Sequence, residues 1–291
     1  MPSLLITGIN GQVGGYLASL DWPGCEVTLA DRDVLDLSRL DELPDKLQSL
    51  APDIIVNPAA YTAVDQAESE PEKAQAINAK APAIMAEYLK SRDGLLVHFS
   101  TDYVFSGNKS GPYSEQDETG PTGVYGASKL AGEVAIVNSG VDHLILRTSW
   151  VYAHSGKNFF LTMLRLAAQR DTLTVVSDQH GTPTFALDLA EMTRDMVLAQ
   201  VPARNPQKLG IFHLGNDGET SWHGFAEAIM RKTGNHHVEV KPVASSEFPT
   251  PARRPANSVL SKNHVLDNYP LTLPDWTQGL DRCIEIHRLS A

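Results

Sequence analysis

Apolar and polar residues alternate along the first half of the chain in the manner of a parallel α/β protein. Short apolar runs, typical of buried strands, occupy residues 4–7, 26–30, 53–57, 95–100 and 143–148. The intervening segments have the spacing of amphipathic helices over residues 12–20, 37–50, 72–90 and 125–139. Strands separated by crossover helices predict a doubly wound α/β fold, with a parallel sheet covered on both faces.

The pattern changes after Trp150. Helical spacing recurs over residues 158–169, 186–199 and 222–233, with extended runs at 173–176 and 210–214. A Pro- and Ser-rich stretch, residues 242–255, predicts a loop on the surface or over a cleft. We therefore predict one domain over residues 1–150. Residues 151–291 would form a smaller α/β lobe for the substrate, with some elements returning to the main sheet.

Composition narrows the class of protein. The 24 basic and 35 acidic residues give a net charge of −11, which argues against nucleic acid or an anionic membrane surface as partner. Two distant cysteines, no signal-like N-terminus and no long apolar run predict a protein of the reducing cytoplasm. His180, His236 and His237 lack the spacing of ligands, so we expect no metal.

The turn after the first predicted strand is rich in glycine. The stretch TGINGQVG places Gly8, Gly11 and Gly14 between a strand and a helix. There, glycines permit a tight turn and close approach of a pyrophosphate, which the helix N-terminus binds. Glycines also close ordinary loops, but the flanking elements and an acidic residue at the next strand end favour a dinucleotide site in a Rossmann-type domain.

The end of the second predicted strand leaves the choice of dinucleotide open. Asp31 can bind the ribose hydroxyls of NADH, whereas Arg32 can bind the 2′-phosphate of NADPH. Arg32 is equally typical of a solvent-facing loop. Asp36 and Leu37 lie where an adenine ring could be flanked.

The stretch NPAAYTAVD follows the third predicted strand. The small side chains of Ala59 and Ala60 would let a cofactor lie against the backbone. A plain turn set by Pro58 gives the same pattern.

Candidate chemistry follows the fourth predicted strand. Thr101 and Asp102 stand at its carboxyl end, where open α/β sheets bind ligands. The stretch VYGASKLAGE then places Tyr125 and Lys129 four residues apart, on one face of a helix. Alone, that pair is also typical of a solvated helix face, and Thr101 of a turn hydroxyl.

Together, these motifs resemble those of the extended short-chain dehydrogenase/reductases and, more narrowly, of the dTDP-4-dehydrorhamnose reductase family. The resemblance runs from residue 8 to about 260 and is most specific in AYTAVDQAESEP, RTSWVYA and TPARRPANS. It implies reduction of the C4 ketone of dTDP-4-dehydro-L-rhamnose to dTDP-L-rhamnose with NADPH or NADH. Such an enzyme supplies a precursor of cell-surface polysaccharide.

The resemblance also assigns roles to positions of this chain. Thr101, Tyr125 and Lys129 become the catalytic set, and Asp102 and Trp150 become sugar contacts. Cofactor contacts are expected from Tyr125, Lys129 and the following residues: Gly8, Asn10, Gly11, Gln12, Val13, Asp31, Arg32, Asp36, Leu37, Ala60, Tyr61 and Thr62.

Each catalytic residue has a chemical reason. Hydride delivery to a ketone leaves an alkoxide, which needs a proton from an acid such as Tyr125. The cation of Lys129 and the oxidised nicotinamide are expected to lower the pKa of that phenol toward the working pH. Thr101 can hydrogen-bond the carbonyl oxygen as charge develops. Lys129 can also hold the nicotinamide ribose.

Two further substrate contacts are weighed against plainer alternatives. Trp150 follows a strand end and can form a stacking wall, although core packing is the commoner fate of tryptophan. Arg253 and Arg254 lie in a Pro-rich loop of an acidic protein, and we expect one of them, Arg254 in particular, to pair with the substrate diphosphate. A solvated loop charge explains them equally well.

The sequence departs from the resemblance at one position. Some members of the family dimerise around Mg²⁺ through a glutamate two positions after the third glycine, where this chain has Tyr16. Mg²⁺ prefers carboxylate oxygen. We therefore expect a monomer, or a homodimer that no metal bridges.

Two other functions remain open at this point. One is a 4-ketoreductase for another dTDP-6-deoxy sugar, because the sequence does not define which face of the ketone meets the nicotinamide. The other is a non-catalytic, NADP-binding regulatory subunit, since a shared fold does not guarantee turnover. The intact set of Thr101, Tyr125 and Lys129 weighs against the second.

Overall fold

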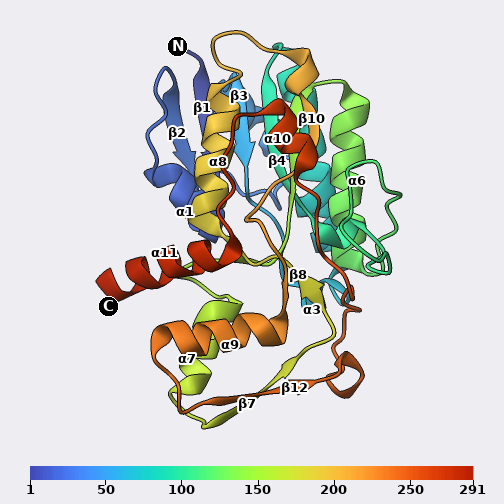
Figure 1. Ribbon diagram of the computed structural model, residues 1–291. Coiled ribbons are helices and arrows are strands. Elements are labelled where there is room, and N and C mark those ends of the chain that lie inside the picture. The colour runs from blue at the N-terminus through green and yellow to red at the C-terminus, as the bar shows by residue number, and fades with distance from the viewer. Residues whose placement is uncertain (291) are drawn as a thin grey trace.

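The computed structural model describes residues 1–290 and is built around one six-stranded sheet (Figure 1). The strand order is β10-β5-β4-β3-β1-β2, and every neighbouring pair is parallel. The strands are β1 (Ser3–Thr7), β2 (Glu26–Ala30), β3 (Ile54–Asn57), β4 (Leu95–Thr101), β5 (Asp142–Thr148) and β10 (Gly210–His213). The order reverses between β1 and β3, as in doubly wound folds. The predicted fold class is confirmed.

Helices cover both faces of this sheet because its strands are apolar on both sides. One face packs against α1 (Gln12–Ser19), α8 (Ala186–Leu198) and α10 (Asn263–Asn268). The other packs against α2 (Leu43–Leu50), α5 (Ala81–Lys90) and α6 (Val124–Ser139). In Figure 1, α8 and α10 cross in front of the strands and α6 runs along the far side. The second half of the chain therefore supplies β10, α8 and α10 to the main body.

The helix predicted over residues 72–90 is a continuous helical segment with an irregular centre. It comprises α4 (Pro71–Gln75), a π-helical turn η1 (Ala76–Lys80) and α5. The π turn contains Asn78, whose side chain binds the backbone N–H and C=O of Tyr61 and the hydroxyl of Ser128. Single π turns commonly mark functional positions. Here the turn ties the loop after β3 to the helix that carries Tyr125.

A smaller lobe lies at the end of the sheet where the strands terminate (Figure 1). Its apolar core is formed mainly by α7 (Phe159–Ala167), α9 (Trp222–Thr233), α11 (Trp276–Leu289) and β7 (Thr172–Val176), which pairs in parallel with β12 (Glu239–Val243). The remaining elements are short: α3 (Val64–Ala67), η2 (Asp102–Val104), β6 (Val151–Tyr152), β8 (His180–Gly181), β9 (Thr184–Phe185), η3 (Pro206–Lys208), β11 (Thr220–Ser221) and η4 (Ser245–Glu247).

Several expectations about elements need correction. The segment 37–50, expected to form one or two short helices, contains one, α2, which begins only at Leu43 because the chain before it runs in turns held by the side chain of Asp36. The predicted loop over 242–255 begins inside β12, where Pro242 is tolerated because β12 pairs with β7 alone. Helices α10 and α11 were not predicted.

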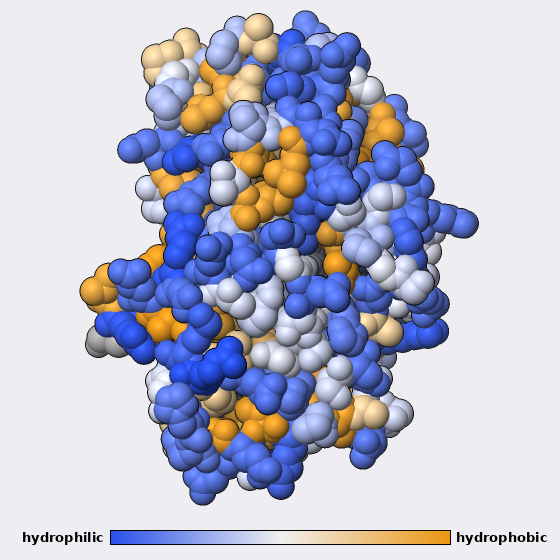
Figure 2. Space-filling model, in the orientation of Figure 1, coloured by the Kyte–Doolittle hydropathy of each residue, from blue (hydrophilic) through white to orange (hydrophobic). Residues whose placement is uncertain are grey.

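The surface is mostly polar, as expected for a chain with many charged residues. The face in Figure 2 is mostly hydrophilic, with apolar side chains gathered in scattered patches. Among residues 1–290, no helix combines the length and the apolar character that a membrane crossing requires.

Candidate active site

The glycine turn between β1 and α1 is packed so tightly that it requires glycine. Gly8 has a φ of 58°, and a Cβ there would lie 2.9 Å from Cα of Ala59. A Cβ on Gly14 would lie 2.1 Å from the carbonyl oxygen of Gly8. Gly11 caps α1 without a side-chain hydrogen bond, so the first N–H groups of this helix are open to an anion. Asn10, Gln12 and Val13 belong to the same turn and first helical residues.

This turn is also tied to the smaller lobe. The side-chain amide of Asn158, which caps α7, donates to Gln12 Oε1 at 2.8 Å. The same amide donates to the carbonyl oxygen of Ala153 at 2.9 Å. Gln12 therefore lies where the two bodies of the molecule meet.

The end of β2 carries Asp31 and Arg32, which favour NADH and NADPH respectively. Asp31 Oδ1 accepts the backbone N–H of Asp33 at 3.0 Å and of Val34 at 3.1 Å, so one carboxylate oxygen shapes the loop. Arg32 is exposed, and its Nε lies 3.2 Å from Asp36 Oδ2. Neither residue is buried or fixed so firmly that it excludes a nucleotide.

A hollow of about 290 Å³ adjoins Arg32. Arg39 and Lys46 also line it, together with the carboxylates of Asp33, Asp36 and Glu42. Three cations and three anions line the hollow, so it has no net positive charge, and a phosphate group there would have to compete with the carboxylates already paired with Arg32 and Arg39.

Other expected cofactor positions differ in access. Leu37 is buried among apolar side chains, so a ligand would meet its backbone rather than its side chain. Ala60 is partly exposed and Thr62 exposed in the loop after β3. Tyr61 is largely buried, and its hydroxyl donates to Glu70 Oε2 at 2.9 Å. Its backbone, held by Asn78, is therefore the fixed part.

Thr101 and Asp102 close β4 at the carboxyl edge of the sheet. Thr101 Oγ1 donates to Asp102 Oδ1 at 2.9 Å and accepts the backbone N–H of Tyr103 at 3.2 Å. Asp102 is buried, and burial raises the pKa of its carboxyl to about 6. Its Oδ2 has no hydrogen bond of normal geometry within residues 1–290, although the Ser258 side chain lies near enough to lower the pKa of this carboxyl, so a ligand hydroxyl would share the site with Ser258.

Tyr125 stands in the first turn of α6, close to this strand end. Gly126 allows the approach, since a Cβ there would lie 2.2 Å from the carbonyl oxygen of Tyr103. Burial raises the pKa of the Tyr125 phenol to about 12, while hydrogen bonding to Thr101 lowers it and the charge of Asp102 raises it further. In the protein without cofactor, the effect of burial on this pKa is larger than any lowering by the Lys129 cation. Burial therefore keeps the proton on the phenol.

Lys129 lies one helical turn further on and is fully buried. Burial lowers the pKa of its ammonium to about 7, against the opposing effect of Glu133. Lys129 Nζ lies 3.0 Å from His98 Nε2. We did not predict any role for His98, although a histidine inside the apolar strand LLVHFS was a visible signal.

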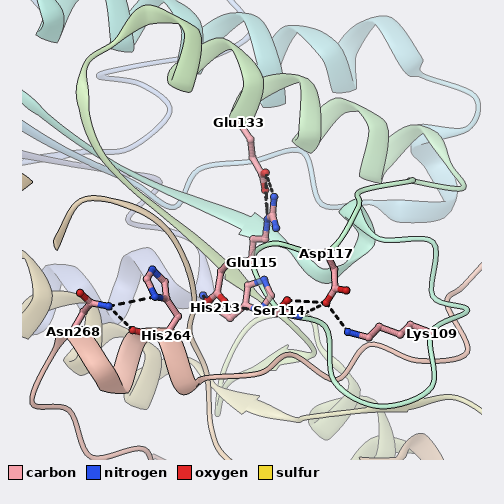
Figure 3. A network of polar contacts seen from close by, with 9 residues as sticks. Lys109, Ser114, Glu115, Asp117, Glu133, His213, His264 and Asn268 are labelled. Carbon is pink, nitrogen blue, oxygen red and sulfur yellow. Dashed lines mark hydrogen bonds and ion pairs between the residues drawn. The ribbon is translucent and has the colours of Figure 1, made fainter. Parts of the chain in front are cut away.

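Glu133, the next residue along this helix face, has a different partner. It forms a buried ion pair with Arg147 of β5, with Nη2 2.6 Å from Oε2 and Nε 3.0 Å from Oε1. Ser100 also donates to Glu133 Oε1. Figure 3 shows Glu133 extending from its helix toward the sheet, and Glu115 and His213 beside the same strand end. The carboxylate of Glu133 is fully paired within the fold, whereas Arg147 Nη1 and both ring nitrogens of His213 are buried without a partner in residues 1–290.

Trp150 takes a strained conformation after β5. Its φ is 49°, in the left-handed region that a tryptophan rarely adopts. Its ring stacks on Trp222 of α9, with centroids 3.7 Å apart and planes 10° from parallel. Strained residues cluster at functional sites. The stacked pair links the end of the main sheet to the smaller lobe.

Arg253 and Arg254 line a hollow of about 480 Å³ between the loop after η4 and the loops near Ser106 and Gln179. Arg254 Nη2 already pairs with Asp65 Oδ2 at 2.8 Å. Its buried Nε has no partner in residues 1–290. Arg254 is thus fixed by one carboxylate and retains a donor for a second.

The geometry brings most of the expected chemical residues to one edge of the sheet. Comparison with known proteins identifies the group to which such a site belongs. The family described as "RmlD substrate binding domain" matches residues 2–289. The chain belongs to this family.

Relatives of this RmlD-family chain cover almost its full length. A dTDP-4-dehydrorhamnose reductase of Burkholderia thailandensis is 45% identical, with 97% of each chain covered. The crystal structure of the Clostridium acetobutylicum dTDP-4-dehydrorhamnose reductase has a TM-score of 0.91 at 36% identity, covering 98% of this chain and 99% of that one. The Bacillus anthracis reductase, solved in complex with NADP, has a TM-score of 0.90 at 36% identity with the same coverage.

Proposed function

We propose that this chain reduces the C4 ketone of dTDP-4-dehydro-L-rhamnose to dTDP-L-rhamnose with NADPH or NADH. The observation that carries the proposal is the meeting of Thr101, Tyr125 and Lys129 at the carboxyl edge of the sheet, next to a glycine turn. The names of the relatives, among them a reductase 45% identical, agree with it.

The residues fit a dinucleotide. Gly8 and Gly14 let the turn pack tightly against Ala59 and on itself, and the start of α1 offers free N–H groups. The cofactor, when bound, supplies the hydride that adds to the C4 carbonyl carbon. Gly11, Gln12 and Val13 would hold its pyrophosphate, Asp31 or Arg32 its adenosine end, and Lys129 its nicotinamide ribose.

Side chains of the protein supply the proton that the carbonyl oxygen takes up. As the carbonyl oxygen gains negative charge, Thr101 donates a hydrogen bond to it and Tyr125 transfers its phenolic proton. A phenol whose pKa is about 12 is fully protonated at neutral pH, which is the form an acid needs. The ammonium of Lys129 stabilises the phenolate that remains, and solvent restores the proton.

Contacts to the sugar nucleotide follow from the open groups nearby. The residue after Thr101 is Asp102, and its carboxylate oxygen Oδ2 has no hydrogen bond of normal geometry in residues 1–290. This oxygen would accept a hydrogen bond from a sugar hydroxyl. The stacked rings of Trp150 and Trp222 would form an apolar wall. The free Nε of Arg254 would pair with the diphosphate. Arg254→Ala should then raise KM for the sugar nucleotide with little change in kcat.

The proposal is tested by following NAD(P)H oxidation at 340 nm with dTDP-4-dehydrorhamnose. Wild type should turn over, and Tyr125→Phe should lose about 10³-fold in kcat while still binding the cofactor. Tyr88→Phe is the matched control, because that hydroxyl lies on α5 and has no partner within residues 1–290. Equal activity of Tyr125→Phe and wild type would refute the proposed acid.

The same assay separates the alternatives. Reduction of other 4-keto nucleotide sugars in preference to dTDP-4-dehydrorhamnose would indicate a different product, which NMR of the sugar would identify. Cofactor binding without turnover of any of them would indicate a regulatory subunit.

We further propose a monomer or a homodimer that no metal bridges. The Tyr16 hydroxyl hydrogen-bonds His154 Nδ1, and its ring packs edge-on to Phe185 with centroids 5.6 Å apart. This side chain is thus engaged within its own chain. Among residues 1–290, no cluster of three or more His, Cys, Asp or Glu side chains is placed to hold a metal. Light scattering with and without EDTA should give the same mass.

A further inference from the structure

A row of polar side chains crosses the sheet beneath Lys129. Thr7, Asn57 and His98 stand on the neighbouring strands β1, β3 and β4, and all three are buried. Asn57 and His98 are direct register partners. Thr7 Oγ1 donates to Asn57 Oδ1 at 2.6 Å, Asn57 Nδ2 lies 3.2 Å from His98 Nδ1, and His98 Nε2 lies 3.0 Å from Lys129 Nζ. The row ends on a residue of the proposed catalytic set.

The row supplies Lys129 with a partner of an unusual kind. A buried ammonium is normally paired with a carboxylate, because desolvation of an isolated charge is costly. The carboxylate whose charge reaches Lys129 is that of Glu133, and it is already bound by Arg147. His98 is neutral, since burial and the nearby Lys129 cation hold the pKa of its imidazole well below the usual value. A neutral acceptor satisfies one N–H of the ammonium and leaves its positive charge intact.

The rest of the row controls which imidazole nitrogen accepts. When Nε2 accepts from the Lys129 ammonium, the ring proton sits on Nδ1 and must be donated to the oxygen of the Asn57 amide. The amide nitrogen then donates to the Thr7 hydroxyl. The side chains as placed have the opposite polarity: Thr7 donates to Asn57 Oδ1 and Asn57 Nδ2 faces His98 Nδ1, so His98 Nε2–H would donate to an uncharged Lys129 amine. The ammonium form of Lys129 requires the Asn57 amide to turn over, which exchanges its oxygen and nitrogen. The same four side chains therefore satisfy both protonation states of the lysine.

We propose that His98 is a positioning residue for the reduction, which holds the Lys129 ammonium beside Tyr125 without cancelling its charge. Asn57 and Thr7 support it because the Asn57 amide, in either orientation, gives His98 Nδ1 a hydrogen-bond partner. The inference rests on the proposed function, because it gives Lys129 its catalytic purpose. A plain core histidine is the alternative, and it predicts a loss of stability with no change in the titration of Lys129.

The titration of Lys129 also depends on the other charged and titratable groups around its face of α6. His98 faces Lys129 from β4, and Glu133 acts on it from α6 itself. Arg147 of β5 is committed to Glu133, and η1 presents the neutral amide of Asn78. Tyr125 shares the helix face, and Glu68 of the α3 end binds the backbone N–H of Val124. His98 is the group that can be changed without disturbing an ion pair.

The test measures the pKa of Lys129 directly, by NMR of the protein labelled with 13C at the lysine ε-carbon. The Lys129 signal is assigned by its absence from Lys129→Met. Wild type should titrate near pH 7. His98→Leu, which removes the acceptor at similar volume, should lower that pKa by about one unit, because a hydrogen bond to the charged form is lost. His98→Gln, which offers an amide oxygen, should restore most of the shift.

Turnover gives the second readout. Lys129 acts as an ammonium, so activity falls as pH rises through its pKa. In His98→Leu the alkaline limb of kcat/KM should move to lower pH by the same unit, giving roughly a tenfold loss at pH 8 and a small one at pH 6. His98→Gln should return the limb toward wild type. An unchanged Lys129 pKa, or a loss of activity equal at every pH, would overturn the proposal.

Two further measures keep the result decisive. If His98→Leu fails to fold, Asn57→Leu tests the same row one step away, and it should lower the Lys129 pKa by a smaller amount in the same direction. If wild type fails to reduce dTDP-4-dehydrorhamnose, the proposed function fails. The titration by NMR still reports on His98, because it needs no substrate.

Discussion

Two buried cations lie beside α6 and β4, and the fold treats them in opposite ways. Arg147 is matched by the carboxylate of Glu133 in a pair whose side chains are 3% and 2% exposed. Lys129, one turn earlier on the same helix as Glu133, is met by the neutral imidazole of His98. A neutralised cation contributes a local structural pair, whereas an unneutralised one retains a field that can act on its surroundings.

The difference suggests how to recognise a functional charge in a buried network. Glu133 and Arg147 neutralise each other's charge, although the buried Nη1 of Arg147 has no hydrogen-bond partner in residues 1–290. Lys129 is held at an energetic cost that the pair does not share, since burial lowers its pKa to about 7. Residues that are destabilised in this way mark sites where the charge is needed for chemistry. Substitutions of the two cations should therefore have opposite consequences.

Lys129→Met should have the largest effect on activity. Loss of the cation leaves the Tyr125 phenolate unsupported, so kcat should fall by about 10³-fold or more. Stability should move the other way. The folded-state pKa of Lys129 lies below its unfolded value, so the cost of burial is absent well above pH 10 and grows as pH falls toward 7.

Urea denaturation at pH 7 should therefore show Lys129→Met to be more stable than wild type by roughly 2–4 kcal/mol, with the gap closing at pH 10. Lys80→Met, at an exposed position of η1, is the control and should change neither quantity. A variant that loses both activity and stability would mean that Lys129 is a structural cation like Arg147.

Arg147→Met should behave in the reverse sense. Removing one partner leaves the buried Glu133 carboxylate without compensation, which costs about 3–5 kcal/mol of unfolding free energy. Activity per folded molecule should stay within a few-fold of wild type at low temperature. The double variant Arg147→Met/Glu133→Gln should recover much of the loss, because no unpaired charge remains. Urea denaturation at pH 7 of wild type, Arg147→Met, Glu133→Gln and the double variant decides the matter, and additive effects of the two substitutions would contradict the pairing.

The sequence predicted the parts of this site that depend on local pattern. The turn with Gly8 and Gly14 and the helix with Tyr125 and Lys129 are each encoded within about a dozen residues. Their convergence follows from a general rule, since parallel strands end at a common edge. The positions of Thr101 and Asp102 could be inferred for the same reason.

The row beneath Lys129 could not be predicted in that way. Thr7 and Asn57 are 50 residues apart, and Asn57 and His98 are 41 apart. Their contact depends on strand register, which no local pattern specifies. The pairing of Arg254 with Asp65, 189 residues away, is of the same kind. The rise in the pKa of Tyr125 on burial was also not predicted, because it depends on packing that no local pattern specifies.

Asp102→Asn extends the comparison to an anion. The folded-state pKa of Asp102 is raised to about 6, so its charge destabilises the fold above that pH, and the penalty disappears as pH falls below about 4. Asn should stabilise the protein by roughly 2 kcal/mol at pH 7 and by little at pH 4. KM for the sugar nucleotide should rise several-fold if Oδ2 binds the sugar. A variant of unchanged stability at both pH values would show that Asp102 is better compensated than its burial suggests.

Arg32→Ala concerns a third cation and should have the smallest effect. Its side chain is 71% exposed, so water and salt screen its charge far more than those of Arg147 or Lys129. If Arg32 binds a 2′-phosphate, KM for NADPH should rise about five- to tenfold with KM for NADH unchanged, and the effect should shrink at high salt. Arg170→Ala, exposed in the smaller lobe, is the control. An equal change for both cofactors would place Arg32 outside phosphate recognition, and a change in neither would make it a solvated charge paired with Asp36.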